Sequence, residues 1–165
     1  MQIEFEKMDI KHQKSIMKIF NYYIENSTAA FAQSALPEQF FGMLLEKSKG
    51  FPAYAIINPE NDEVLGFFML SAYNPFSTFK ETATISYFIS KDYVGKGIGA
   101  QCLKRLEAEA LQSGIKHILA QISSENHGSL NFHSKHGFKV CGTLKNIGYK
   151  LDRQFDVIYM QKDLS

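Results

Sequence analysis

The chain has 165 residues, of which 45% are hydrophobic and 21% are charged. This length suits one ordinary domain, so we expect a single domain over residues 1–165, and the apolar content excludes a disordered chain. The 18 Lys and Arg nearly balance the 17 Asp and Glu, which argues against a nucleic-acid binder. No apolar run approaches the roughly 20 residues of a membrane span, and the N-terminus has no apolar signal segment. We therefore expect a cytoplasmic protein that does not contact a membrane.

Cysteine and histidine usage argues against a disulfide and against a metal site. The two cysteines, Cys102 and Cys141, are expected to be free thiols, and neither position suggests an exposed nucleophile. Neither cysteine has the spacing partner of a zinc site, and the five histidines form no pair at helical spacing with a third ligand nearby. We expect no bound metal.

Hydrophobic periodicity predicts strands and helices in an order typical of a mixed sheet. Period-two patterns predict strands, apolar faces at helical spacing predict helices, and Pro37, Gly114 and Gly137 mark helix ends. The predicted fold class is therefore α/β (α+β), with six to seven strands and about four helices covering both faces. Strands are expected at residues 3–7, 53–57, 64–71, 82–89, 117–122, 139–144 and 155–161, and helices at 11–25, 37–45, 98–113 and 126–136.

A glycine-rich turn between a strand and a helix is the most informative motif. Gly95, Gly97 and Gly99 alternate with Lys96 and Ile98 just where the third helix begins. Glycines allow close approach of the backbone to a ligand, and the unpaired N–H groups and dipole at a helix start favour an anion such as a phosphate. The turn fits neither the P-loop pattern nor the dinucleotide pattern Gly-x-Gly-x-x-Gly. It predicts a phosphate site of another kind.

The segment Gly95-Lys96-Gly97-Ile98-Gly99-Ala100 resembles the acetyl-CoA pyrophosphate loop of the GNAT acetyltransferases. The resemblance extends over nearly the whole chain and is closest to the phosphinothricin N-acetyltransferase branch. It includes the early stretch at residues 22–31, the helix that starts at Asn126 and the late stretch at residues 148–161. It implies a GNAT fold, acetyl-CoA as the acetyl donor, and a strand that splays from its neighbour to receive the pantetheine arm. The cofactor-binding residues that it implies are Phe88, Ile89, Ser90, Val94, Gly95, Lys96, Gly97, Ile98, Gly99, Ala100, Asn126 and Ser129.

Two positions depart from the family pattern. Val94 stands where the loop usually begins with Arg or Gln, which removes one side-chain contact but leaves the backbone cradle. Thr84 stands where the branch often has a catalytic Glu in the strand that leads to the loop. A threonine cannot serve as a general base near neutral pH, so the base must be another group.

Three other residues are candidates for acid–base roles. Glu81 is the nearest carboxylate, but in a regular strand it faces away from Thr84, and a solvated carboxylate is the simpler interpretation. Glu25 lies in the early matching segment, where a helix-end carboxylate is an equally good interpretation. His133 stands where many GNAT proteins have a tyrosine near the sulfur of CoA, and the branch usually has a histidine there. It would orient the thioester or protonate the thiolate, although a half-buried helix histidine is the common alternative.

These observations predict an acetyl-CoA-dependent N-acetyltransferase that moves the acetyl group directly to a small-molecule amine. The resemblance suggests an amino-acid analogue such as phosphinothricin or methionine sulfoximine as the acceptor, and a homodimer. Two alternatives stay open: an acyl-CoA-binding module without catalysis, and an acetyltransferase of the same fold acting on a protein N-terminus or a polyamine.

Overall fold

The structure is a computed structural model that describes residues 1–165. It contains seven strands and four α-helices in the predicted order, with four single-turn 3₁₀ helices between them. The strands are β1 (Glu4–Lys7), β2 (Ala53–Asn58), β3 (Glu63–Ala72), β4 (Thr82–Ile89), β5 (His117–Ser123), β6 (Lys139–Lys150) and β7 (Arg153–Asp163). The α-helices are α1 (Gln13–Asn26), α2 (Phe41–Lys47), α3 (Ile98–Gln112) and α4 (His127–Lys135).

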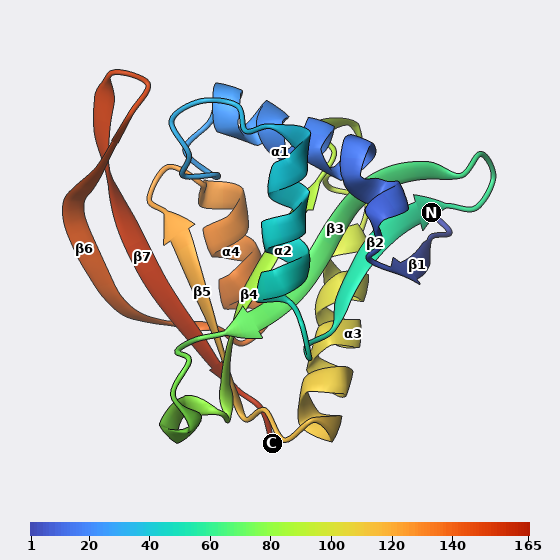
Figure 1. Ribbon diagram of the computed structural model, residues 1–165. Helices are drawn as coiled ribbons and strands as arrows, with labels where there is room; N and C mark the ends of the chain where they lie inside the picture. The colour runs from blue at the N-terminus through green and yellow to red at the C-terminus, as the bar shows by residue number, and fades with distance from the viewer.

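All seven strands belong to one sheet in the order β1-β2-β3-β4-β5-β7-β6. Helices cover both of its faces, with α1 and α2 on one face and α3 and α4 on the other (Figure 1). Neighbouring strands run antiparallel except β4 and β5, which run parallel because α3 carries the chain from one to the other. The predicted mixed sheet is confirmed.

The two faces of the sheet carry separate apolar cores. Ala83 and Ile85 of β4 pack with the α3 residues Cys102 and Leu106 in one buried cluster. On the other face, α1 and α2 pack with alternate residues of β2 and β3, which include Phe67. This two-sided burial follows from the alternation of side chains along each strand.

The β6–β7 hairpin is longer than the sequence predicts. The two strands pair until a tight turn at Leu151 and Asp152, whose φ angles of 55° and 59° are left-handed. Such a turn matches the twist of a two-stranded ribbon. Most of β6 is exposed, so its sequence has no inward–outward alternation to mark where the strand ends.

The cysteines are free thiols, as predicted. Cys102 is buried in α3, and burial raises the pKa of its thiol to about 12. Neither cysteine was expected to be an exposed nucleophile, and the exposure of Cys141 on β6 corrects that expectation as far as exposure is concerned. No helix combines the length and the apolar character that a bilayer span requires.

Candidate functional site

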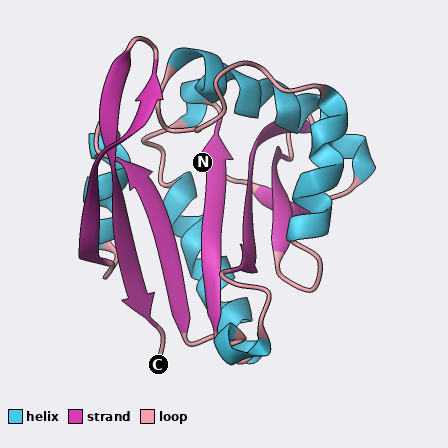
Figure 2. Cartoon of the chain, turned by 60° about the vertical axis from the view of Figure 1, so that its left-hand side comes forward, coloured by secondary structure: helices cyan, strands magenta, loops and turns pink.

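The parallel strands β4 and β5 separate halfway along β4. Their pairing joins Thr82 with His117, Ala83 with Ile118 and Thr84 with Leu119, and it stops there. Beyond Thr84, β5 continues beside β7 whereas β4 continues beside β3, so the two strands diverge towards their C-terminal ends (Figure 2). The splayed strand that the resemblance implies is therefore present.

The divergence leaves backbone groups of β4 without a strand partner. The N–H of Ser90 donates to the carbonyl of Leu65 on β3, at 2.7 Å. Because hydrogen bonding in an antiparallel pair alternates between the two sides of a strand, Ile85, Tyr87 and Ile89 direct their N–H and C=O groups towards the side of β5. The carbonyl of Ile89 already accepts a hydrogen bond from the Tyr23 hydroxyl of α1. The N–H of Ile85 still serves the last pairing with β5, between Thr84 and Leu119. The C=O of Ile85, both groups of Tyr87 and the N–H of Ile89 form a free strand edge.

The glycine turn lies at the end of this edge. Gly95 and Gly97 have φ angles of 76° and 80°, in the left-handed region that favours glycine, and a Cβ at either position would meet no atom within 4 Å. Gly97 is the N-cap of α3 and has no side chain to occupy the first N–H groups of the helix. Lys96 is exposed beside it. The turn therefore presents unpaired donors, and the positive end of the helix dipole, to an open surface suited to phosphate.

The other predicted cofactor residues differ in how exposed they are and in which face of the sheet they occupy. Gly99 brings α3 close to α4, because a Cβ there would lie 3.4 Å from the Phe132 ring. Val94 is 55% exposed, so it offers surface but no hydrogen bond. Ile98 is buried, and Ala100 is half-buried. The Phe88 side chain points to the α1 face of the sheet, where its ring centroid lies 5.5 Å from that of Tyr23.

Asn126 and Ser129 begin α4. The Asn126 side chain accepts a hydrogen bond from the N–H of Ser129 at 3.2 Å and so caps the helix. The capping interpretation is confirmed for Asn126, and contact of either residue with a cofactor stays a prediction.

His133 is buried and uses both of its ring nitrogens. Nδ1 lies 2.7 Å from the carbonyl of Ser129, which can only accept, so Nδ1 carries the proton in the neutral ring. Nε2 then accepts from the hydroxyl of Tyr87, at 2.7 Å. Burial lowers the pKa of His133 from its ordinary value, which favours the neutral ring. A direct contact between this imidazole and a thioester would require Tyr87 to move.

Thr84 lies at the last paired position before the strands diverge. Ala83 and Ile85 point into the core beside α3, so Thr84 and Ser86 point to the opposite face, on the side of α1 and α2. Ser71 of β3 pairs with Thr84 and shares this face. On this face, the surface beside the diverging strands therefore carries the neutral hydroxyl groups of Thr84, Ser86 and Ser71, which we call the hydroxyl floor. The family pattern would supply a carboxylate at Thr84.

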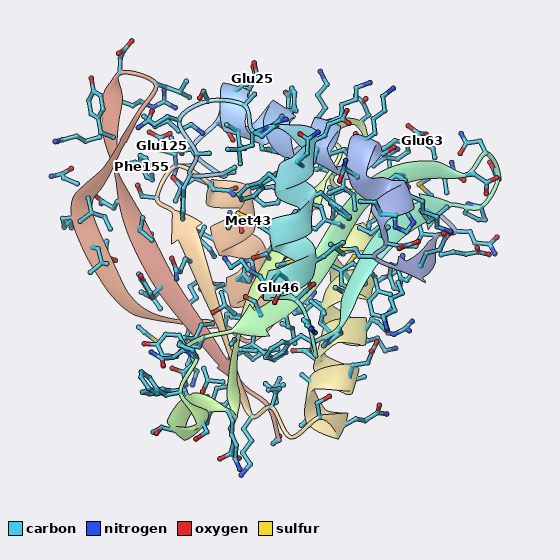
Figure 3. All side chains as sticks on the ribbon, in the orientation of Figure 1. Glu25, Met43, Glu46, Glu63, Glu125 and Phe155 are labelled. Carbon is cyan, nitrogen blue, oxygen red and sulfur yellow. The ribbon has the colours of Figure 1, made fainter.

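Neither carboxylate candidate lies on this floor. Glu81 precedes β4 at the other end of the strand, where its carboxylate forms a 2.6 Å ion pair with Lys116 that lowers its pKa. The pairing of β4 with β3 shows no bulge that would reverse its direction. Glu25 is exposed near the end of α1, and its side chain points outward in Figure 3. The structure brings neither of them to Thr84.

Several polar residues at this site were not predicted from the sequence. Tyr87 and Tyr23 contact it through the hydrogen bonds described above. A second group lies where the loop after α1 meets the β6–β7 hairpin: Lys150 is fully buried, and Glu125 binds both Arg153 and Thr28. These residues are far apart in sequence, so no local pattern indicates that they meet.

Comparison with known proteins identifies the family. Residues 16–138 match the model of the Acetyltransferase (GNAT) family. An L-methionine sulfoximine/L-methionine sulfone acetyltransferase of Pseudomonas paraeruginosa is 29% identical over 151 residues, which cover 90% of this chain and 87% of that protein. A phosphinothricin N-acetyltransferase of Alcaligenes faecalis is 28% identical over 156 residues, which cover 92% and 77%.

A solved structure shares the fold closely. It is a phosphinothricin acetyltransferase from Sinorhizobium meliloti in complex with acetyl-CoA, and it superposes with a TM-score of 0.93. It is 23% identical and covers 100% of this chain and 90% of its own. The match to the family model spans the diverging strands, the glycine turn and all of α4. This chain belongs to the GNAT family of acetyltransferases.

Proposed function

We propose that this chain transfers the acetyl group of acetyl-CoA to the amine of a small molecule, with an amino-acid analogue such as phosphinothricin or methionine sulfoximine as the acceptor. The observation that carries the proposal is the glycine turn placed at the end of a strand edge that has no partner. The names of the two curated relatives support this acceptor class.

Backbone groups of this chain would hold the donor. The N–H groups at residues 95–100 suit the pyrophosphate, and the free edge of β4 suits the amides of the pantetheine arm. Acetyl-CoA supplies an acyl group already activated as a thioester. The N–H group of Tyr87 faces the divergence and would polarise its carbonyl without any charged side chain.

The acceptor would approach from the face that carries Thr84. The side opposite is filled by α3 and α4, whereas the α1 and α2 face exposes Met43 and Glu46 of α2 beside the sheet (Figure 3). The loop at residues 27–33 and the β6–β7 hairpin lie on the same face, around the end of β5 (Figure 1). They would form the far wall of the acceptor site.

Direct transfer suits this site because neither cysteine thiol lies in it. Cys102 is buried behind the sheet with a raised thiol pKa, and Cys141 lies on the exposed strand β6. With Thr84 in place of a carboxylate, the amine would lose its proton to solvent before it attacks. Positioning and backbone polarisation would then supply most of the rate acceleration.

We also propose a homodimer that forms through β6. This strand is the edge of the sheet, so one side of its backbone has no partner strand. Long exposed edges favour pairing with another chain. The exposed apolar side chains of Val140 and Leu144 would be covered by a second copy. Sedimentation at micromolar concentration tests this, and a monomer would remove the dimer from the proposal.

A screen of amines at fixed acetyl-CoA, with thiol release as the signal, tests the proposed reaction. We expect turnover with at least one amino-acid analogue, and mass spectrometry should find the acetyl group on its nitrogen. Thr84 favours one alternative, an acyl-CoA-binding module without catalysis. Tight binding of acetyl-CoA with no turnover on any amine, peptide N-terminus or polyamine would support that alternative.

A further inference from the structure

A buried lysine joins the loop after α1 to the β6–β7 hairpin. Lys150 is 1% exposed, and its ammonium donates to the carbonyl of Ser27 at 2.7 Å and to that of Ala30 at 2.6 Å. Burial lowers the pKa of Lys150, and no neighbouring charge offsets this effect. The ammonium is thus compensated by backbone carbonyls alone.

The position of these carbonyls explains how a cation is accommodated there. Ser27 is the C-cap of α1, so its carbonyl lies at the negative end of the helix dipole and has no partner within the helix. Hydrogen bonds from an ammonium to such carbonyls are stronger than bonds between neutral groups. An apolar side chain would fill the same space without the desolvation cost of a charge. The ammonium therefore fixes the conformation of the loop, because it holds two of the loop's carbonyls at one point on the hairpin.

Other contacts hold the same loop in the same place. Thr28 lies 2.7 Å from the hydroxyl oxygen of Ser123 and donates to Glu125 at 3.0 Å. The Gln33 amide donates to the carbonyl of Tyr149 at 2.6 Å. Glu125 lies at this junction in Figure 3, between the end of β5 and the hairpin. Among these residues, Lys150 alone binds two backbone carbonyls of the loop.

The loop and the hairpin enclose a hollow of about 280 Å³. Phe31 from the loop stacks on Phe155 of β7, with ring centroids 6.1 Å apart, so the loop conformation sets the position of one wall. Five of the eight lining residues are hydrophobic.

We propose that Lys150 is a positioning residue for the acceptor: by holding the carbonyls of Ser27 and Ala30, it places Phe31 against the hairpin and so shapes the wall that the amine substrate meets. This rests on the proposed function, in which the loop at residues 27–33 flanks the acceptor. Lys150 does not touch the glycine turn. Its removal should therefore change recognition of the amine and leave recognition of acetyl-CoA unchanged.

The kinetic test replaces Lys150 with methionine, which keeps the length of the side chain and removes its donors. We expect Lys150→Met to raise KM for the acceptor about tenfold or more, because two charge-assisted hydrogen bonds are lost, while Kd for acetyl-CoA stays within about threefold. Lys150→Arg restores donors and should recover part of the loss. Lys145→Met is the matched control on the same strand, where the lysine side chain is 78% exposed, and it should behave as wild type.

A second measurement does not depend on activity. Hydrogen exchange of the free protein should show faster exchange at residues 27–33 in Lys150→Met and no change in α3. Phe31→Ala provides a variant that keeps the lysine: its effect on the acceptor KM should not add to that of Lys150→Met, because both act through one wall. If the methionine variant does not fold, Lys150→Arg and Phe31→Ala still report on the wall.

The outcomes separate this inference from the proposed function. An unchanged acceptor KM in Lys150→Met, or an equal weakening for acetyl-CoA, would overturn the positioning role. Slow exchange at residues 27–33 in that variant would also overturn it. A wild type that transfers acetyl to no amine would refute the proposed function, and the exchange experiment would still decide whether Lys150 holds the loop.

Discussion

The hydroxyl of Tyr87 on β4 donates a hydrogen bond to Nε2 of His133 on α4, across 2.7 Å and 46 residues of sequence. This bond joins the free strand edge to α4, whose Phe132 ring packs against Gly99 at the start of α3. Because Nδ1 of the same ring donates to Ser129, the imidazole has no free nitrogen for a substrate. His133 is thus hydrogen-bonded to β4 through the Tyr87 hydroxyl.

We predict that the Tyr87–His133 pair is coupled in folding stability. Tyr87→Phe leaves a buried nitrogen without a donor, and His133→Ala leaves both a cavity and an unpaired hydroxyl, so each should cost about 1–3 kcal/mol or more. The double variant should cost less than the sum of the two by at least about 0.5 kcal/mol. Urea denaturation of the four proteins measures this. Strictly additive losses would mean that the hydrogen bond contributes no net stability.

The lowered pKa of His133 predicts a loss of stability in acid. The unfolded chain protonates this histidine near its ordinary pKa of about 6.5, whereas the folded chain takes up the proton only at lower pH. The unfolded state therefore binds more protons between these two values. The contribution of His133 is complete above about pH 6.5 and decreases as the pH falls towards the folded pKa.

Unfolding free energies measured between pH 7.5 and about 5 test this linkage. His133→Gln keeps an acceptor for Tyr87 but does not titrate, so its stability should decline less steeply than that of the wild type. Parallel curves for the two proteins would show that His133 has the same pKa in both states.

Gly97→Val should weaken acetyl-CoA binding by about tenfold or more, because a β-branched residue strongly disfavours the left-handed φ of 80° at the start of α3. Gly97→Asn should lose less, since asparagine tolerates that region. Gly50→Val is the matched control: Gly50 has a φ of 84° and open space around it, but lies in the turn after α2. Calorimetry measures the three affinities, and a similar loss in the control would attribute the effect to general strain.

Val94→Arg should tighten acetyl-CoA binding or leave it unchanged. The Val94 side chain is 55% exposed at the entrance to the turn, so a guanidinium fits there without repacking and adds a charged donor for phosphate. The gain should decrease as salt is added, because exposed charge interactions are screened. Titration at two ionic strengths measures both effects, and weaker binding at each of them would contradict the prediction.

Thr84→Glu should change the pH dependence of turnover. In the wild type the rate should rise about tenfold per pH unit below the amine pKa, because solution supplies the free amine. A carboxylate on the hydroxyl floor would accept the proton within the site, which raises the rate near neutral pH and flattens the rise. Thr84→Gln is the neutral control of similar size. An identical slope for the glutamate variant would mean that residue 84 does not face the amine.

The order of elements was predictable because each carries its own local signal. The glycine turn, the helix ends at Gly114 and Gly137 and the strand at residues 82–89 all follow from such patterns. Those signals reflect burial on one face, which residues close in sequence reveal. The strand ends of the β6–β7 hairpin were missed because β6 is exposed on both sides.

The polar contacts of the site were not predictable in the same way. A lysine in a strand usually lies in solvent, and Lys150 is buried only because the end of α1 supplies carbonyls from 120 residues away. From the sequence alone, Tyr87 is expected to be a core aromatic residue, because its hydrogen-bond partner His133 lies 46 residues away. Each of these roles depends on a partner that the fold brings from a distant part of the chain.

The short parallel pairing of β4 and β5 also has a mechanical consequence. Only three residue pairs join β1–β4 to β5–β7, so the sheet consists of two blocks that share a narrow seam. One apolar core under α3 packs against both blocks, and a molecule bonded to both of them would bridge the seam as an additional strand does. The melting temperature of the whole chain would then rise with the concentration of that molecule. The seam would gain backbone contacts like those of the other strand pairs only while the molecule is bound.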